Sequence, residues 1–282
     1  MATIVPVAPV ETVERFPGLS ARLLKLLKSL PAGHWEAPTA CPGWSVKDVA
    51  AHLLGGNLGR LSFGRDRLQL PQGGDGPQGY AELVGFINRR NAEWVEAARQ
   101  ISFPLLIQFI ELTDPQVYEY FKSLPPYEKA GIPVAWAGEA QSAWWFDIAR
   151  EYTEKWLHQQ HIREAVGAPL LIERPWLYPV LDTFLRALPH AYRQVNAPDG
   201  TAVCLRITGK AGGRWTLLRQ KGQWQLHTGE TGNATASVQI DQGTAWRLFS
   251  KGIDSATAQS VTSFAGDFAL GRQFLEAVAI MA

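Results

Sequence analysis

The sequence predicts a helical bundle followed by a small α+β domain, and two observations lead to this fold class. Up to about residue 196, apolar residues recur at the spacing of amphipathic helices. From Thr201 onward, short runs alternate polar and apolar residues with a period of two, as half-buried strands do. We therefore expect two domains, residues 1–170 and residues 171–282, the second opening with a helical connection.

Five helices are expected in the first domain. Leucines at helical spacing mark the first helix, and prolines bound the fourth one. The glycine- and proline-rich stretch 70–78 is the most loop-like of the chain, and 127–138 is expected to be an irregular loop. The expected helices are residues 11–31, 45–68, 80–102, 105–124 and 140–166.

The second domain is expected to begin with a helix at residues 172–192. Residues 196–200 are rich in turn-forming side chains and mark the change of periodicity. The alternating runs after them predict short antiparallel strands joined by glycine-rich turns. The expected strands are residues 201–208, 214–219, 223–227 and 235–241, followed by helices at 242–251 and 267–282.

Composition limits the class of protein. Of the 282 residues, 46% are hydrophobic and 19% are charged, and the net charge of +1 argues against a basic nucleic-acid-binding surface. Cys41 and Cys204 are the two cysteines; their wide separation suits a reducing compartment rather than a disulfide framework. The N-terminus lacks the basic region of a signal peptide, and no apolar run reaches about 18 residues. We expect a cytoplasmic protein without a membrane partner.

The stretch from Cys41 to His52 joins a turn to a helix start. Cys41 is followed by proline and glycine, which are turn residues, and it is expected to serve the turn rather than act as a nucleophile. Ser45 followed three residues later by Asp48 is an acidic variant of the capping box that opens a helix. His52 lies about two turns into that helix.

Three glycines share the helical face of His52, namely Gly55, Gly56 and Gly59. Each costs roughly 1 kcal/mol relative to alanine inside a helix. Two interpretations stay open: a close helix–helix crossing with a structural histidine, or space kept free beside the imidazole.

The helix expected at 140–166 carries a narrow ionisable stripe. At about 100° per residue, five ionisable side chains fall within about 80°, and large apolar residues border both edges. A solvated face would not have such borders, so the stripe is expected to face an interior or a cleft, where charged groups need partners. Its members are Asp147, Glu151, Glu154, His158 and His161.

Glu154 and His158 are four residues apart, so both side chains can reach one ion, although most such pairs are surface salt bridges. With His52 they make a set of two histidines and one carboxylate, which suits zinc with its fourth position open. Non-haem iron uses the same ligand types. His161 could be a fourth ligand, a proton carrier or a partner of the ligands, and Asp147 and Glu151 are candidates to orient them.

The chain resembles the mycothiol-dependent maleylpyruvate isomerase family, a branch of the DinB-like four-helix-bundle group. Cys41-Pro-Gly-Trp-Ser-Val-Lys-Asp-Val with Ala-His52-Leu is similar to its N-terminal signature, and Glu154-x-x-x-His158 to its second motif. Residues 201–282 resemble the sterol-carrier-like domain often attached to these bundles. Many members have aspartate at the position of His161, which is a departure in this chain.

The resemblance implies a divalent metal, usually zinc, held by His52, Glu154 and His158. It further implies a low-molecular-weight thiol that reaches the metal as thiolate and, in the isomerase branch, adds to maleylpyruvate to give fumarylpyruvate. We therefore expect a monomeric enzyme for isomerisation or S-transfer on a small organic substrate with a mycothiol- or bacillithiol-type thiol. The alternatives are a non-enzymatic hydrophobic-ligand-binding protein and a thiol-independent metal hydrolase.

Overall fold

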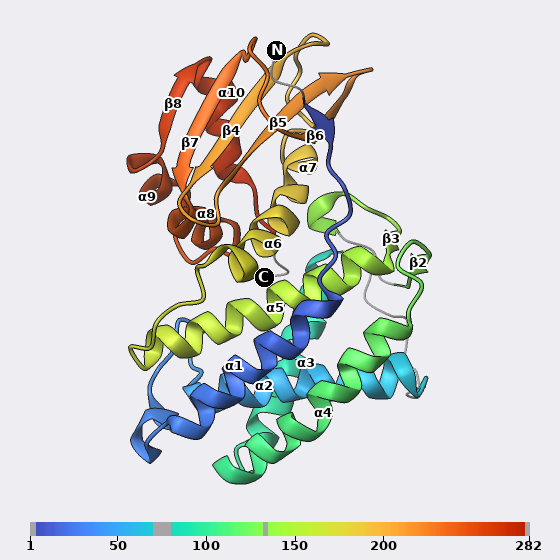
Figure 1. The fold of residues 1–282 in the computed structure, drawn as a ribbon, viewed down its shortest axis with the longest axis vertical. Helices are drawn as coiled ribbons and strands as arrows, with labels where there is room; N and C mark the ends of the chain where they lie inside the picture. Colours follow the sequence, from blue (N-terminus) through green and yellow to red (C-terminus); the bar gives the residue numbers. More distant parts are fainter. Residues whose placement is uncertain (1–3, 70–79, 132–134, 280–282) are drawn as a thin grey trace. The chain divides into compact units, whose positions relative to one another are not determined.

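The computed structural model describes residues 4–69, 80–131 and 135–279. Its contacts divide the chain into a helical unit, which runs from Thr12 to Pro126 and from Arg150 to Leu171, and a sheet unit that holds all the other described residues (Figure 1). The predicted fold class, a helical N-terminal region with a C-terminal α+β region, is confirmed. The division into domains at residues 1–170 and 171–282 stays a prediction.

The helical unit is built from long helices that pack against one another; the buried face of the first of them carries Leu19, Leu23 and Leu27. Helix α2 packs against α3 and α4, and α1 packs against α4. The π-helix η3 (Arg60–Arg65) continues α2, and the single turns η1 (Val13–Arg15) and η2 (Ala32–Glu36) flank α1. The long helices are α1 (Phe16–Ser29), α2 (Val46–Gly59), α3 (Tyr80–Ala98), α4 (Phe103–Ser123) and α5 (Trp144–Ala165), the first residues of α5 belonging to the sheet unit.

The helix predicted at 45–68 is correct in position and changes type before its end. The α-helical hydrogen bonds stop near Gly59, and the amide of Asp66 donates to the carbonyl of Leu61, five residues earlier, at 2.8 Å. The loop predicted at 70–78 lies outside the described residues. The helix predicted at 11–31 is shortened by Pro17, which is tolerated in the first helical turn but not further in.

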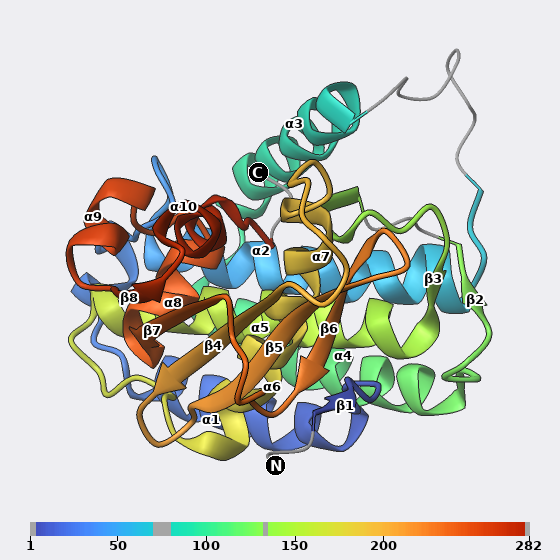
Figure 2. The same ribbon diagram turned by 90° about the horizontal axis from the view of Figure 1, so that it is seen from above.

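The sheet unit has a mixed sheet of six strands among its described residues, in the order β1-β6-β5-β4-β7-β8 (Figure 2). Only β4 and β7 run parallel; the other neighbours are antiparallel. The strands are β1 (Val5–Pro6), β4 (Ala202–Thr208), β5 (Gly213–Gln220), β6 (Gln223–Thr228), β7 (Ala236–Asp241) and β8 (Ser263–Gly266), and a separate two-stranded pair joins β2 (Lys129–Ala130) to β3 (Ser142–Ala143).

Short helices pack against this sheet. α7 contacts β6, α8 contacts β4 and β7, and α10 contacts β7 and β8. The helix predicted at 172–192 is divided into α6, the turn η5 (Leu185–Ala187) and α7. The last predicted helix is wrong in length, because regular structure ends with η6 (Gln273–Glu276) and residues 280–282 lie outside the described residues. The helices are α6 (Arg174–Phe184), α7 (Leu188–Ala191), α8 (Gln242–Phe249), α9 (Ser255–Ser260) and α10 (Phe268–Arg272).

The sequence analysis missed β1, β3, α9 and β8, and β3 takes the place of the first residues of the helix predicted at 140–166. β1 is two residues long, too short to show a period, and it is a strand only because Val5 and Pro6 pair with Thr228 and His227 of β6. The loop predicted at 127–138 contains β2 and the turn η4 (Ala135–Ala137). Among the residues that the structure describes, every helix is too short or too polar to cross a lipid bilayer.

The predicted capping box at the start of α2 is present. The Ser45 hydroxyl accepts a hydrogen bond from the Asp48 amide at 3.3 Å, and the Asp48 carboxylate accepts one from the Ser45 amide at 3.0 Å. Arg99 also donates to Asp48, at 3.0 and 3.2 Å. Burial raises the pKa of Asp48, but these hydrogen bonds outweigh burial and lower it. The box thereby fixes where α2 begins and which face carries His52.

We expect Ser45→Ala to lower the free energy of unfolding by about 1 kcal/mol, since the substitution removes one partner of the capping box. Urea denaturation measures the change. Ser123→Ala is the matched control, because that exposed hydroxyl only donates to the Tyr120 carbonyl near the end of α4, and it should change the free energy by less than about 0.5 kcal/mol. Equal effects of the two substitutions would contradict the role of the box.

Candidate metal centre

The turn before α2 is held by its own hydrogen bonds. The amide of Trp44 donates to the carbonyl of Cys41 at 3.0 Å, and Gly43 adopts a φ of 78°, which glycine tolerates best. The Thr39 hydroxyl accepts from the Cys41 amide at 3.2 Å and donates to the Trp44 carbonyl at 2.8 Å. The turn therefore places the Cys41 side chain and the start of α2 together.

Three predicted ligands meet between α2 and α5. The Nε2 atom of His52 lies 3.0 Å from Oε1 of Glu154, and Nε2 of His158 lies 2.9 Å from the same oxygen. The two imidazole rings are edge to face, with centroids 4.6 Å apart. One carboxylate oxygen thus serves two imidazoles that come from different helices.

The group is sheltered on the histidine side and open at the carboxylate. The side chains of His52 and His158 keep 13% and 12% of their surface exposed, whereas Glu154 keeps 45%. The indole of Trp44 lies beside His52, with ring centroids 5.1 Å apart. A small molecule can therefore approach the donor atoms from the side of Glu154.

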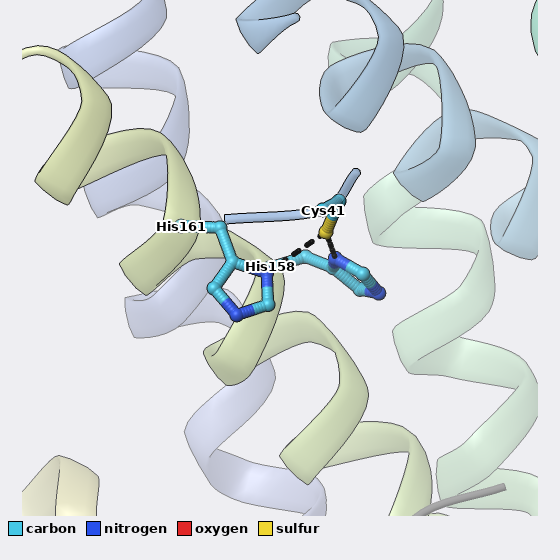
Figure 3. Close-up of side chains that lie close together, drawn as sticks. All are labelled: Cys41, His158 and His161. Carbon is cyan, nitrogen blue, oxygen red and sulfur yellow. Dashed lines mark hydrogen bonds between the residues drawn. The ribbon is translucent and has the colours of Figure 1, made fainter. Parts of the chain in front are cut away.

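Cys41 lies against the other edge of His158, which the sequence analysis did not anticipate. Its sulfur is 3.7 Å from Nδ1 of His158 and 3.1 Å from Nδ1 of His161 (Figure 3). His158 and His161 are three residues apart on α5 and project from the same face. A cysteine directly ahead of a helix start was the available signal, but a local pattern does not show what the turn packs against.

The charged groups shift one another's pKa values. Burial raises the pKa of Glu154, but the charge of His158 and hydrogen bonds with both imidazoles hold it well below its usual range. Burial lowers the pKa of His158, but the Glu154 carboxylate and the Cys41 sulfur raise it to about 10. Burial raises the pKa of the Cys41 thiol, but His158 and His161 lower it to about 6. The site is a closely coupled set of charges.

The residues fit a divalent metal ion. The donor atoms of His52, Glu154 and His158 all lie within 4.8 Å of one another. Two imidazole nitrogens and one carboxylate oxygen are donors that zinc accepts, with a further position left for water or a substrate. Among the described residues, one further group of three donors lies equally close together, made by Cys41, His158 and His161.

The other predicted members of the stripe have different surroundings. Glu151 accepts a hydrogen bond from Nε of Arg60 at 2.8 Å. Asp147 is buried near the start of α5, and neither donor group contains it or Glu151. Their role in orienting the ligands stays a prediction. The stripe was predicted to face an interior or a cleft. Its burial agrees with this, because Asp147 is buried and the other four residues are partly buried, with 45% of the Glu154 side chain exposed.

The three glycines on the face of His52 have different surroundings. A Cβ atom at Gly55 would lie 2.5 Å from Nε1 of Trp94, whose indole donates to the Ala51 carbonyl at 2.7 Å. Gly55 therefore permits a close packing contact, and the interpretation as space kept free is wrong there. At Gly56 a Cβ would make an ordinary contact with Glu151, and at Gly59 it would meet nothing within 4 Å.

Comparison with known proteins gives a consistent result. The mycothiol maleylpyruvate isomerase N-terminal domain family matches residues 16–163. The uncharacterized proteins MT0041 and Rv0036c, from two strains of Mycobacterium tuberculosis, are each 26% identical to this chain over 199 residues; the alignment covers 68% of this chain and 70% of each relative.

Two crystal structures have a similar fold: the mycothiol-dependent maleylpyruvate isomerase and a mutant of it. Each is 10% identical to this chain, with a TM-score of 0.51, and the superposition covers 86% of this chain and 88% of the other. At this identity the likeness concerns the fold.

We expect Cys41 to be alkylated by iodoacetamide well before Cys204, because its pKa of about 6 makes it mostly thiolate at pH 7, whereas Cys204 is buried. The rate should fall as the pH is lowered through 6, where the thiolate takes up a proton. Mass spectrometry of metal-free protein measures both sites. A rate for Cys41 that still rises steeply above pH 8, as for an ordinary thiol, would contradict the lowered pKa.

Proposed function

The chain belongs to the mycothiol maleylpyruvate isomerase N-terminal domain family, and from that premise we propose that it is a metal-dependent enzyme that works with a low-molecular-weight thiol. Its reaction is an isomerisation or an S-transfer on a small organic substrate. The thiol is of the mycothiol or bacillithiol type, the metal is zinc, and the enzyme is a cytoplasmic monomer. The observation that carries the proposal is the convergence of His52, Glu154 and His158 at 2.9 to 3.0 Å.

The three ligands are held by two helices. The capping box at Ser45 and Asp48 fixes the start of α2 and thereby the direction of His52. Glu154 and His158 are one turn apart on α5, so the helix itself sets their spacing. Ligands held by two packed helices are positioned before a metal arrives, which lowers the entropy lost on binding.

Cys41 contacts the ring nitrogen of His158 that faces away from Glu154, and this contact orients the ring. Its Nδ1 atom faces the Cys41 sulfur at 3.7 Å while Nε2 faces Glu154. Histidines that bind metals usually donate their other ring N–H to an acceptor, which fixes the tautomer and the ring plane. Cys41 occupies that place in this chain.

A divalent ion bound by this set would supply positive charge that holds a thiol as thiolate at neutral pH. The chain's own contribution is the open side at Glu154, through which thiol and substrate enter, and the indole of Trp44 beside His52. The indole is tilted by 46° against the imidazole and shelters part of it from solvent. The substrate is not determined by these features.

A second candidate function is the binding of a hydrophobic ligand without catalysis. A cavity of about 340 Å³ with mostly apolar walls lies between α1, α4 and α5, and its polar edge includes Lys155 and Asp114. Ligand extraction from purified protein followed by mass spectrometry tests this alternative. A bound lipid that stays after complete removal of metal would favour it over the enzyme.

We expect purified protein to contain about one metal ion per chain, and His158→Ala to lower the affinity for zinc at least about 100-fold, since a missing ligand costs more than a missing partner of a ligand. Elemental analysis and competition with a chelator measure both. His34→Ala is the matched control, because that histidine is exposed on η2. Equal metal content in the two variants would remove the basis of the proposal.

The dependence on thiol needs a background without Cys41, whose sulfur would give the same spectroscopic signal. In the cobalt-loaded Cys41→Ser variant, mycothiol or bacillithiol should produce a thiolate-to-cobalt charge-transfer band in the near ultraviolet. Glutathione serves as a comparison for selectivity. A cobalt spectrum that none of the thiols changes would indicate a hydrolase that uses bound water.

A further inference from the structure

Three soft or borderline donor atoms converge on the side of His158 that faces away from Glu154. They are the sulfur of Cys41 and the Nδ1 atoms of His158 and His161 (Figure 3). All three lie within 4.8 Å of one another. Both imidazoles turn the same type of nitrogen toward one sulfur, which is an arrangement of metal ligands as well as of hydrogen-bonding groups.

The separations suit a tetrahedral ion. Zinc lies about 2.3 Å from a thiolate sulfur and about 2.0 Å from an imidazole nitrogen, so that these two donors are roughly 3.5 Å apart around one ion. The observed distances from Sγ of Cys41, 3.1 Å to His161 and 3.7 Å to His158, lie on either side of that value. Small rotations of the side chains are enough to form the site.

The two ligand sets differ in chemistry. The set of His52, Glu154 and His158 includes a carboxylate oxygen, which is a hard donor. The set of Cys41, His158 and His161 replaces it with a sulfur, and sulfur favours thiophilic ions such as zinc, cadmium and copper(I). The second set uses no group that the resemblance implies as a ligand except His158.

His158 belongs to both sets through different nitrogens. Nε2 faces Glu154, and Nδ1 faces Cys41. A neutral imidazole has one nitrogen with a free lone pair, while the other carries a proton. His158 can therefore serve only one set at a time unless it loses its second ring proton, which is strongly unfavourable near neutral pH.

We propose that Cys41, His158 and His161 form a second ligand set that takes a thiophilic divalent cation, in competition with the set of His52, Glu154 and His158. On binding, the thiolate sulfur and the two Nδ1 atoms donate lone pairs to the ion. Each imidazole stays neutral and keeps one ring proton on Nε2, and any second ring proton or remaining thiol proton passes to solvent; no electron transfer is involved. The chain then holds one ion, in one set or the other. This inference shares His158 with the proposed function and is otherwise independent of it.

Reciprocal variants separate the two sets. His52→Ala breaks the first set and leaves the second complete, whereas Cys41→Ser and His161→Ala break the second and leave the first complete. Each metal-free variant is titrated with cobalt(II) and cadmium(II), and circular dichroism checks that it is folded. No thiol is added, so a sulfur-to-metal charge-transfer band reports ligation by a cysteine of the chain, and Cys204→Ser assigns it.

His52→Ala is expected to bind one ion per chain with a sulfur-to-metal band. Cys41→Ser should bind one ion without the band, and His161→Ala should require at least about tenfold more cadmium to show it. Absence of the band in both wild type and folded His52→Ala, or two ions per wild-type chain, would overturn the inference. A different result would contradict the proposed function. If His52→Ala binds metal and Cys41→Ser does not, the set of His52, Glu154 and His158 is not a metal site.

A measurement on the unsubstituted protein guards against a folding defect in the variants. Cadmium is expected to slow alkylation of Cys41 more than tenfold, while Cys204 in the same sample serves as the internal reference. Magnesium, which does not favour sulfur, should leave the rate unchanged. An unchanged rate at saturating cadmium would show that Cys41 only forms hydrogen bonds with His158 and His161, contrary to the inference.

Discussion

The carboxylate of Glu154 is the group on which the arrangement of the site depends. One of its oxygens lies within 3.0 Å of two imidazoles, one from α2 and one from its own helix α5. The two imidazoles keep only 13% and 12% of their side-chain surface exposed, and polar groups sheltered in this way need hydrogen-bonding or charged partners. The two helices are thus packed around a polar contact that leucine and valine side chains could not replace without losing the site.

Two other charged residues of α5 also have charged or hydrogen-bonding partners. Glu151 pairs with Arg60, which lies in the π-helix that extends α2. One turn after Glu151, Lys155 contacts Asp114 of α4 and Asn57 of α2. The π-helix and the polar residues of α2 and α4 therefore have an electrostatic role, because they provide the partners that make this polar helix compatible with the interior.

His158 is shared by the two groups of donor atoms. Its two ring nitrogens face different donors, a carboxylate on one side and a sulfur on the other. In a protein with one ligand set, the far nitrogen would only orient the ring. Here Nδ1 of His158 lies close to donor atoms of Cys41 and His161, which can themselves bind metal. The tautomer of His158 then decides which ligand set is complete.

The sequence by itself determined the local part of this protein. Helical spacing placed Glu154 and His158 on one face, the capping box placed the start of α2 ahead of His52, and alternation identified four strands, because these patterns depend on neighbours along the chain. Tertiary structure decided the rest. Cys41 and His158 are 117 residues apart, and Trp94 fills the space beside Gly55 from a different helix. Which side chains meet across such separations depends on how the helices pack, and no local pattern carries that information.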